Sequence, residues 1–146
     1  MKILVTGGTG YIGSHTIVEL LNKNYDVIAI DNFYNSKKDV INKIKKITNK
    51  DFKFYEGNVC DKNILEKIFN ENKIDAVIHF SGYKAVGESV EKPIMYYRNN
   101  IDSTLSLIEV MNKFNCKKLV FSSSATVYKI SEIMPIKENF PLSTTN

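Results

Sequence analysis

The sequence of 146 residues predicts an α/β fold in which a doubly wound parallel sheet carries helices on both faces. Two observations predict it. Short apolar runs alternate with stretches of helical apolar spacing, and a glycine-rich turn joins the first run to the first such stretch. Strict alternation of strand and helix produces parallel strands with right-handed crossovers. We expect strands near 2–6, 26–30, 52–56, 75–80 and 117–122 and helices near 11–23, 37–48, 62–71 and 94–115.

The glycine-rich turn reads Val5-Thr6-Gly7-Gly8-Thr9-Gly10-Tyr11-Ile12-Gly13. It fits the GxGxxG pattern starting at Gly8 and the wider GxxGxxG pattern starting at Gly7. At a strand-to-helix turn such glycines permit a tight turn and let the backbone approach a pyrophosphate, while the helix N-terminus presents N–H groups to the phosphate charge. No lysine follows Gly13, which excludes a Walker-type phosphate loop. The turn therefore predicts a dinucleotide site on a Rossmann-type sheet.

The second strand ends in Asp31, close to the spacing of about 20 residues expected for the acid that binds the adenosine ribose. A carboxylate there accepts hydrogen bonds from the ribose hydroxyls and repels a 2′-phosphate. Lys37 and Lys38 follow and would soften that repulsion, but the acid at the strand end meets the ribose directly. The sequence therefore predicts NAD in preference to NADP.

The remaining elements follow from capping signals and apolar spacing. Asp61 is suited to cap the third helix and Pro93 to begin the fourth, which presents Leu107, Ile108, Met111 and Phe114 on one face. The dinucleotide turn selects the strand order 3-2-1-4-5. No sixth strand follows residue 122, so we expect the fifth strand to be an open edge. Residues 1–146 are thus expected to form the N-terminal part of an NAD-binding domain, incomplete at its C-terminal edge.

Composition narrows the function classes. The hydrophobic fraction of 43% and charged fraction of 25% are ordinary for a soluble domain, and no apolar segment is long enough for a membrane span. The net charge of +4 comes from lysines spread over helix faces without a recognised nucleic-acid module, so we expect no nucleic-acid partner. Cys60 and Cys116 lack metal-ligand spacing, which predicts no metal site and a cytoplasmic location.

Polar loops follow the third, fourth and fifth strands. Asn58 is placed to bond an adenine edge, although an ordinary turn is equally compatible with Gly57-Asn58-Val59. The small-residue loop that begins at Phe80 carries Lys84, which is placed to meet phosphate or ribose oxygens. Three serines at 122–124 leave the fifth strand without a nucleophile elbow, so they favour hydrogen bonding to a sugar or carbonyl oxygen over acyl transfer. His79 lies inside the fourth strand and is expected to be a core residue, and His15 is assigned no role.

On these motifs the chain resembles the extended short-chain dehydrogenase/reductase family, specifically its sugar-nucleotide epimerases. The resemblance runs from end to end. Its most specific motifs are Lys84-Ala-Val-Gly-Glu-Ser-Val-Glu-Lys-Pro93 and Phe121-Ser-Ser-Ser-Ala-Thr-Val-Tyr128. Sugar-nucleotide dehydratases carry Thr-Asp-Glu where this chain has Ser124-Ala125-Thr126. The resemblance implies NAD contacts from Gly7, Gly10, Tyr11, Ile12, Gly13, Asp31, Asn32, Phe33, Tyr34, Asn35, Ser36, Asn58, Val59, Phe80, Ser81, Gly82, Tyr83, Lys84, Asn99 and Ser124.

The resemblance also implies an activity. The substrate would be a UDP-hexose bound by Ser124 and Lys84, with Ser124 bonding the sugar 4-oxygen. Tightly held NAD would take hydride from the sugar and return it to the other face of a 4-keto sugar. A homodimer is implied for the full-length members of the family.

The chain departs from the family at the catalytic base, which is the tyrosine of a Tyr-x-x-x-Lys motif. That motif follows a segment resembling Glu138-Asn139-Phe140-Pro141, and the sequence ends at Asn146 just short of it. We therefore expect the sixth strand, the Tyr-x-x-x-Lys helix and the substrate domain to be missing. Tyr34 and Lys38 have the spacing but follow the second strand, far from the reacting end, and a base must reach its proton.

Two smaller departures are Asn58, where the family more often has aspartate, and Lys129, where it usually has glycine. Asn58 keeps an acceptor oxygen, whereas Lys129 disfavours a positive φ. Three functions follow as hypotheses. The chain is part of a sugar-nucleotide epimerase and inactive alone, or it is a short NAD or sugar-nucleotide sensor, or it belongs to an epimerase acting on UDP-uronates or UDP-N-acetylhexosamines.

Overall fold

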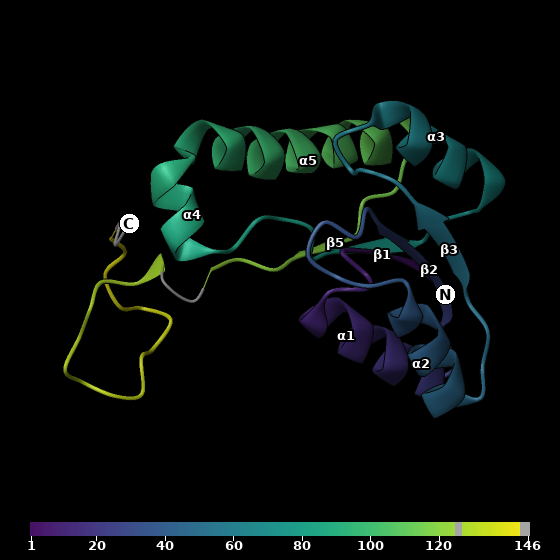
Figure 1. The fold of residues 1–146 in the computed structure, drawn as a ribbon, viewed down its shortest axis with the longest axis horizontal. Helices are drawn as coiled ribbons and strands as arrows, with labels where there is room; N and C mark the ends of the chain where they lie inside the picture. The colour runs from purple at the N-terminus through teal and green to yellow at the C-terminus, as the bar shows by residue number, and fades with distance from the viewer. Residues whose placement is uncertain (125–126, 144–146) are drawn as a thin grey trace.

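The computed structural model describes residues 1–124 and 127–143 and contains one parallel five-stranded sheet with the order β3-β2-β1-β4-β5 (Figure 1). This order confirms the expected one. Parallel pairing sets β1 between β2 and β4, with Val5 opposite Ala29 on one side and Ile78 on the other. The strands are β1 (Lys2–Thr6), β2 (Asp26–Asp31), β3 (Lys53–Glu56), β4 (Ala76–His79) and β5 (Leu119–Phe121).

Helices cover both faces of the sheet, with α1 and α2 on one side and α3 and α5 on the other (Figure 1). Their bounds are α1 (Tyr11–Asn22), α2 (Asp39–Thr48), α3 (Lys62–Glu71), α4 (Val86–Glu91) and α5 (Pro93–Lys113). The four expected helices are confirmed to within two residues at each end. The sequence did not predict α4, because its six residues bury no side chain and so carry no apolar periodicity.

Alternation along β1 divides the core into two layers. Ile3 and Val5 pack with Ile17 of α1, whereas Leu4 packs with Leu65 of α3 and Leu107 of α5. All are nearly or fully buried because successive side chains of a strand point to opposite faces. A sheet covered on both faces explains why its central strands read as continuous apolar runs.

The ends of α3 and α5 obey the expected signals, but one residue predicted on the buried face of α5 is exposed. The Asp61 side chain accepts a hydrogen bond from the Asn63 N–H, and Pro93 stands at the first position of α5. The expected buried face of α5 is confirmed for Leu107 and Met111, but Ile108 is 45% exposed. The prediction was wrong there because the face recurs every three or four residues, and Ile108 lies about 100° around the helix from Leu107.

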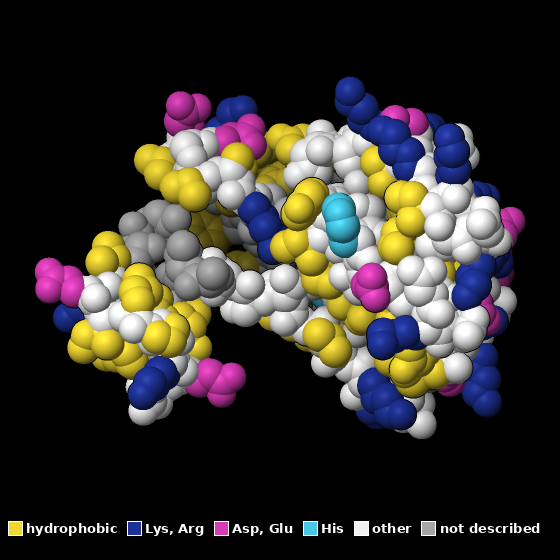
Figure 2. All heavy atoms as spheres, turned by 90° about the horizontal axis from the view of Figure 1, so that it is seen from below, with side chains coloured by type: hydrophobic (Ala, Val, Ile, Leu, Met, Phe, Trp, Pro, Cys, Tyr) yellow, Lys and Arg dark blue, Asp and Glu magenta, His cyan; other side chains and the backbone are white. Residues whose placement is uncertain are grey.

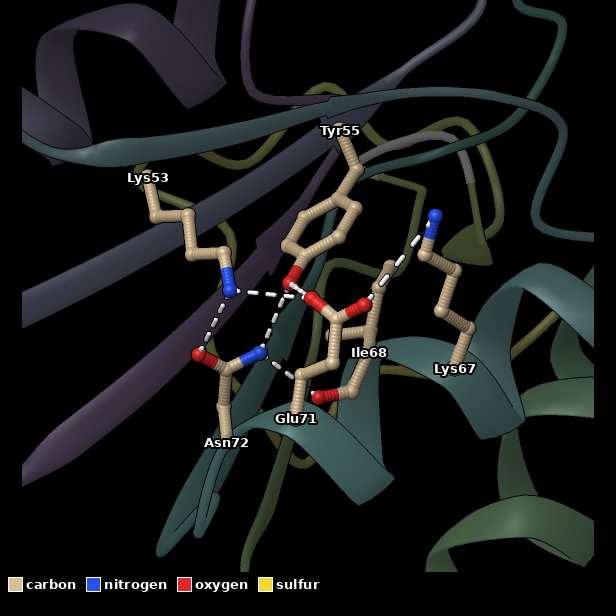
Figure 3. A network of polar contacts seen from close by, with 6 residues as sticks. All are labelled: Lys53, Tyr55, Lys67, Ile68, Glu71 and Asn72. Carbon is tan, nitrogen blue, oxygen red and sulfur yellow. Dashed lines mark hydrogen bonds and ion pairs between the residues drawn. The ribbon is translucent and has the colours of Figure 1, made fainter.

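A polar cluster fastens the outer strand β3 to the end of α3 (Figure 3). The Tyr55 hydroxyl donates to Glu71 Oε2 at 2.5 Å, and Lys53 reaches the same oxygen at 3.0 Å. Asn72, just after α3, donates to the Tyr55 hydroxyl and to the Ile68 carbonyl. Together these bonds close the last turn of the helix against the sheet edge.

The chain after β5 extends away from the sheet (Figure 1). All three residues of β5 are exposed, as expected for an open edge. Beyond them Tyr128 bridges to Leu142, and Lys129 donates its N–H to the Pro141 carbonyl, with no positive φ at Lys129. Figure 2 shows this segment as a lobe apart from the main body, with many hydrophobic side chains on its surface. Ala125 and Thr126 of the predicted motif lie outside the described residues.

Within residues 1–124 and 127–143, no helix is both long enough and apolar enough to cross a membrane.

Candidate functional site

A pocket of about 290 Å³ lies at the carboxyl edge of the sheet, above β1. Loops after four strands and one face of α5 form it, in the place where open α/β sheets bind ligands. The pocket is lined by Gly7, Gly10, Tyr11, Ile12, Gly13, Asp31, Asn32, Tyr34, Asn35, Gly57, Asn58, Val59, Phe80, Ser81, Gly82, Tyr83, Lys84, Asn99 and Ser103.

The glycine turn is shaped by close approach of its own backbone. Gly7 has a φ of +66° and donates its N–H to the Ile30 carbonyl at 2.9 Å. A Cβ on Gly13 would lie 2.1 Å from the Gly7 carbonyl oxygen, so only glycine lets α1 begin this close to the strand. The first intrahelical bond runs from Ser14 to Gly10, which leaves the N–H groups before Ser14 without intrahelical acceptors.

The pocket distinguishes the two glycine patterns that the sequence left open. Gly7, Gly10 and Gly13 line it, which is the wider GxxGxxG spacing. Gly8 instead faces the core, where a Cβ would lie 2.8 Å from Ala29 Cβ and 3.0 Å from Ile17 Cδ1. Gly8 therefore permits helix-to-sheet packing rather than ligand approach.

Asp31 ties the glycine turn to the loop that follows β2. Its Oδ2 accepts from the Thr9 N–H at 3.0 Å and its Oδ1 from the Phe33 N–H at 2.9 Å. The Ser36 hydroxyl donates to Oδ1 at 3.4 Å and lies 2.7 Å from the Thr9 hydroxyl. The carboxylate is 8% exposed and lines the pocket, so it combines a structural role with a position suited to a ligand hydroxyl.

Neither of the two lysines expected near Asp31 lines the pocket. Lys38 forms an ion pair with Glu56 at 2.7 Å and stacks over the Phe33 ring. Neither Lys37 nor Lys38 is among the residues that line the pocket. Among the residues of β2 and its following loop that line the pocket, Asp31 is therefore the charged one.

A buried histidine supports the loop after β4 without lining the pocket. His79 Nδ1 lies 2.7 Å from the Thr6 hydroxyl and Nε2 lies 3.2 Å from the Thr104 hydroxyl. Thr6 also accepts from the Ser81 N–H, and Thr104 donates to the Asn100 carbonyl. This pattern assigns the neutral ring with its hydrogen on Nε2. His79 is 1% exposed, which confirms it as a core residue, and burial first, then the charge of Lys84, lowers its pKa to about 4.

Asn100 of α5 fixes the same loop from its other end. It accepts from the Tyr83 N–H through Oδ1 at 2.7 Å and donates to the Tyr83 carbonyl at 3.0 Å. Lys84, the next residue, is exposed and lines the pocket. A loop held by Thr6 at one end and by Asn100 at the other presents Lys84 from a defined backbone.

The structure brings together all but three of the residues predicted to bind the cofactor. Phe33 and Ser36 follow β2 but do not line the pocket, since the Phe33 ring packs on Phe54 and the Ser36 hydroxyl bonds Asp31. Ser124 is exposed beyond β5 and also does not line it.

Sequence reasoning missed two lining residues. Gly57 directly precedes Asn58 at the carboxyl end of β3, so its position on the chain was a sufficient signal. Ser103 lies four residues after Asn99 on α5, which places both on one helix face. The side-chain oxygen of Asn58 accepts from the Cys60 N–H at 2.9 Å and has one further lone pair for a ligand.

Comparison with known proteins adds an independent finding. Residues 3–146 match the model of the NAD dependent epimerase/dehydratase family. The chain is 56% identical to UDP-glucose 4-epimerase of Bacillus subtilis and 55% identical to that of Haemophilus influenzae, in both cases over the whole chain. It covers 43% and 44% of those proteins, so it spans less than half the length of the curated relatives it matches.

Solved structures agree with the sequence matches. UDP-glucose 4-epimerase from Bifidobacterium longum, in complex with NAD+ and UDP, superposes with a TM-score of 0.95 at 54% identity, covering 98% of this chain and 43% of that one. The Stenotrophomonas maltophila enzyme, with bound NAD and formylated UDP-arabinopyranose, gives a TM-score of 0.94 at 38% identity, with 98% and 43% coverage.

Proposed function

Because the chain belongs to the NAD dependent epimerase/dehydratase family, we propose that its pocket binds NAD and that the protein carries the cofactor-binding part of a UDP-glucose 4-epimerase. Such an enzyme interconverts UDP-glucose and UDP-galactose in galactose metabolism. The observation that carries the proposal is the pocket itself, in which the GxxGxxG turn, Asp31 and the loop after β4 converge. The relatives with more than half of their aligned residues identical support the substrate class.

The residues present fit a dinucleotide. Gly7 and Gly13 let the turn pack where a Cβ would collide with neighbouring backbone, so α1 begins close to the strand and its first turn offers N–H donors to a pyrophosphate. Asp31 would accept from the adenosine ribose, while Lys38 is held by Glu56 and does not offset the repulsion of a 2′-phosphate. These features support NAD over NADP. When bound, NAD supplies a reversible hydride acceptor for the carbon that bears the sugar 4-hydroxyl.

We assign substrate contacts to Lys84 and Ser124. Lys84 would offer its ammonium to phosphate or sugar oxygens from the edge of the pocket. The Ser124 hydroxyl would bond the sugar 4-oxygen, where a positioned donor stabilises the charge that develops as that oxygen loses its proton. Ser124 follows β5, the strand next to β4, on the same edge of the sheet as the pocket.

Proton abstraction is not assigned to a residue of this sequence. Tyr34 and Lys38 form its sole Tyr-x-x-x-Lys spacing. The Tyr34 hydroxyl points to Glu88 on α4, whereas Lys38 pairs with Glu56 at the end of β3. A tyrosine base needs its lysine beside it and the substrate within hydrogen-bond reach. We therefore propose that the 146 residues bind the cofactor without turning over substrate by themselves.

A second copy of the chain is the proposed protein partner. Ile94, Ile101, Leu105 and Ile108 recur at helical spacing on α5 and are between 45% and 71% exposed. An apolar stripe of this kind on one long helix supports association with a matching stripe across a two-fold axis.

The function is tested by titrating the 146-residue chain with NADH and NADPH while following cofactor fluorescence, and by assaying conversion of UDP-galactose to UDP-glucose. We expect saturable NADH binding, at least tenfold weaker NADPH binding, and no epimerisation. Asp31→Asn should reduce the ratio of NADH affinity to NADPH affinity. Absence of NADH binding would overturn the cofactor proposal, and epimerisation by the chain would overturn the statement that proton transfer is not performed by these residues.

A further inference from the structure

Two loops on opposite sides of β1 meet over the pocket. The loop after β2 carries Tyr34 and the loop after β4 carries Tyr83, and β2 and β4 are the two strands that flank β1. The Tyr34 and Tyr83 rings lie 4.4 Å apart between centroids with an interplanar angle of 31°. Both residues line the pocket. Their contact therefore joins the loop after β2 to the loop after β4 at the pocket.

A carboxylate on α4 strengthens that contact from outside. Glu88 Oε1 accepts from the Tyr34 hydroxyl at 3.5 Å, the outer limit of a hydrogen bond, and Oε2 accepts from the Tyr96 hydroxyl at 2.8 Å. The Tyr96 ring packs edge-on against Tyr83 at 5.4 Å. Tyr34, Tyr83, Tyr96 and Glu88 thus form one connected group, which we call the tyrosine latch.

The two ends of the latch differ in how firmly they are held. Tyr96 is 8% exposed on α5, and Tyr83 is fixed at its backbone by Asn100. Tyr34 is 52% exposed and is joined to the rest of the latch by one ring contact and one long hydrogen bond. Opening of the latch therefore requires movement of Tyr34 away from a fixed partner surface.

The size of the pocket supplies the reason to open. Its volume of about 290 Å³ lies at the lower end of the roughly 300–1,000 Å³ of small-molecule sites, whereas a dinucleotide carries two nucleosides and a pyrophosphate. A ligand that long must pass between the two loops that Tyr34 and Tyr83 join. Closure over it would then bury the aromatic rings against the ligand or against each other.

Building on the proposed NAD site, we propose that the tyrosine latch closes over the bound dinucleotide and slows its release, with Tyr34 as the moving part and Glu88 as its acceptor. Tyr34, Glu88 and Tyr96 are positioning residues in this proposal, because they act by holding the cofactor. A latch of this kind changes the release rate far more than it changes the recognition of NAD over NADP.

The experiment is a stopped-flow displacement in which the 146-residue chain is preloaded with NADH and mixed with excess NAD. We expect Tyr34→Ala, which removes the ring and the hydroxyl, to release NADH about tenfold faster. Tyr34→Phe keeps the ring contact and should release it about threefold faster. The association rate should stay the same or rise in both variants, since the closed state is the one that is weakened.

Tyr55→Phe is the matched control. It also removes a tyrosine hydroxyl from a glutamate, here Glu71, but lies on β3 outside the pocket lining (Figure 3). It should lower stability without changing NADH release. Release rates of Tyr34→Ala within twofold of the unmodified chain, or an equal change in Tyr55→Phe, would overturn the latch.

A double-mutant cycle separates the latch from simple support of α4 by Glu88. Glu88→Ala should speed release, and adding Tyr34→Phe should then have no further effect, because Glu88→Ala already removes the acceptor of the Tyr34 hydroxyl. Additive effects would show that Glu88 acts through Tyr96 or Lys92 and not through Tyr34, and would overturn its part in the latch. If the unmodified chain binds no NADH, the proposed function fails and the latch with it, which is distinguishable from binding with unchanged release.

Discussion

The turn after β1 and the segment after β5 both leave the same edge of one parallel sheet, yet only the first lines the pocket. After β1, Gly7, Thr9 and Gly13 are held by backbone contacts and by Asp31. After β5, residues 123 and 124 are exposed and do not line the pocket. β1 has a strand on each side to supply flanking loops, whereas β5 has β4 alone. The pocket lies above β1 because the loops after both neighbouring strands, β2 and β4, meet there.

The largest effect is expected where the first region is tightest. Gly13→Ala would place a methyl group 2.1 Å from the Gly7 carbonyl, so either the turn or the start of α1 must move. We expect NADH affinity to fall at least about a hundredfold and stability to fall by about 3 kcal/mol. Fluorescence titration and urea unfolding measure the two quantities.

Gly87→Ala is the control for this change. Gly87 lies on α4, and no atom of residues 1–124 or 127–143 lies within 4 Å of an added Cβ, so neither quantity should fall. Equal behaviour of the two alanine variants would show that the turn is not tightly constrained.

The next effect concerns His79, which links Thr6 at the end of β1 to Thr104 of α5. Its pKa is about 4 in the folded chain against 6.5 for the free side chain, so protonation favours the unfolded state. The contribution of neutral His79 to the free energy of unfolding should therefore be fully present above pH 6.5. The free energy of unfolding should decline by about 3 kcal/mol as the pH falls to 4. Urea unfolding across this range measures the slope, and His79→Gln should flatten it.

Carboxylates are expected to act in a lower window. The hydrogen bond from Lys43 lowers the pKa of Asp39, so its contribution persists above 3.8 and is lost only as the pH falls below that value. An unchanged slope between pH 6.5 and 4 in His79→Gln would contradict the role given to His79.

A valine-to-alanine substitution made in β1 and in β5 compares how firmly the two strands are packed. Val5 of β1 is fully buried and Val120 of β5 is 61% exposed. Val5→Ala should cost about 2 kcal/mol from lost burial and the cavity left behind. Val120→Ala should change stability by less than about 0.5 kcal/mol. Comparable losses in urea unfolding would show that β5 is as firmly packed as β1.

The smallest effect is expected at a helix cap beside the site. Asp61 accepts from the Asn63 N–H at 2.9 Å and follows the loop that carries Asn58. Asp61→Ala should cost about 1 kcal/mol, while Asp61→Asn should cost less because asparagine also caps helices. Thermal unfolding by circular dichroism distinguishes them, and equal losses would contradict the capping role.

Most of the fold could be read from the sequence because its local signals agree with its packing. The glycine turn, the Asp61 cap and Pro93 each mark an element boundary through chemistry that acts within a few residues. The strand order followed from alternation and from the turn. The short helix α4 escaped prediction because it buries nothing, and Ile108 was misplaced because a face was drawn from neighbours in sequence.

The site was predictable to the same extent and for a related reason. Residues at strand ends, such as Asp31 and Asn58, lie at the pocket because parallel strands all end at one edge. Ser103 required knowledge of which face of α5 turns toward the pocket. The contact of Tyr34 with Tyr83 and Glu88 joins residues about 50 positions apart, so no local sequence pattern predicts it.

The double role of Asp31 has a consequence for redesign of cofactor preference. Both of its oxygens already accept backbone N–H groups from the glycine turn and the following loop. Exchanging it for a neutral or basic residue to admit a phosphorylated dinucleotide would remove the repulsion and untie the turn in one step. A successful redesign must therefore separate charge from anchorage, for example by keeping Asp31 as the acceptor of both N–H groups and placing a new positive charge at Ser36, whose hydroxyl points to the same carboxylate.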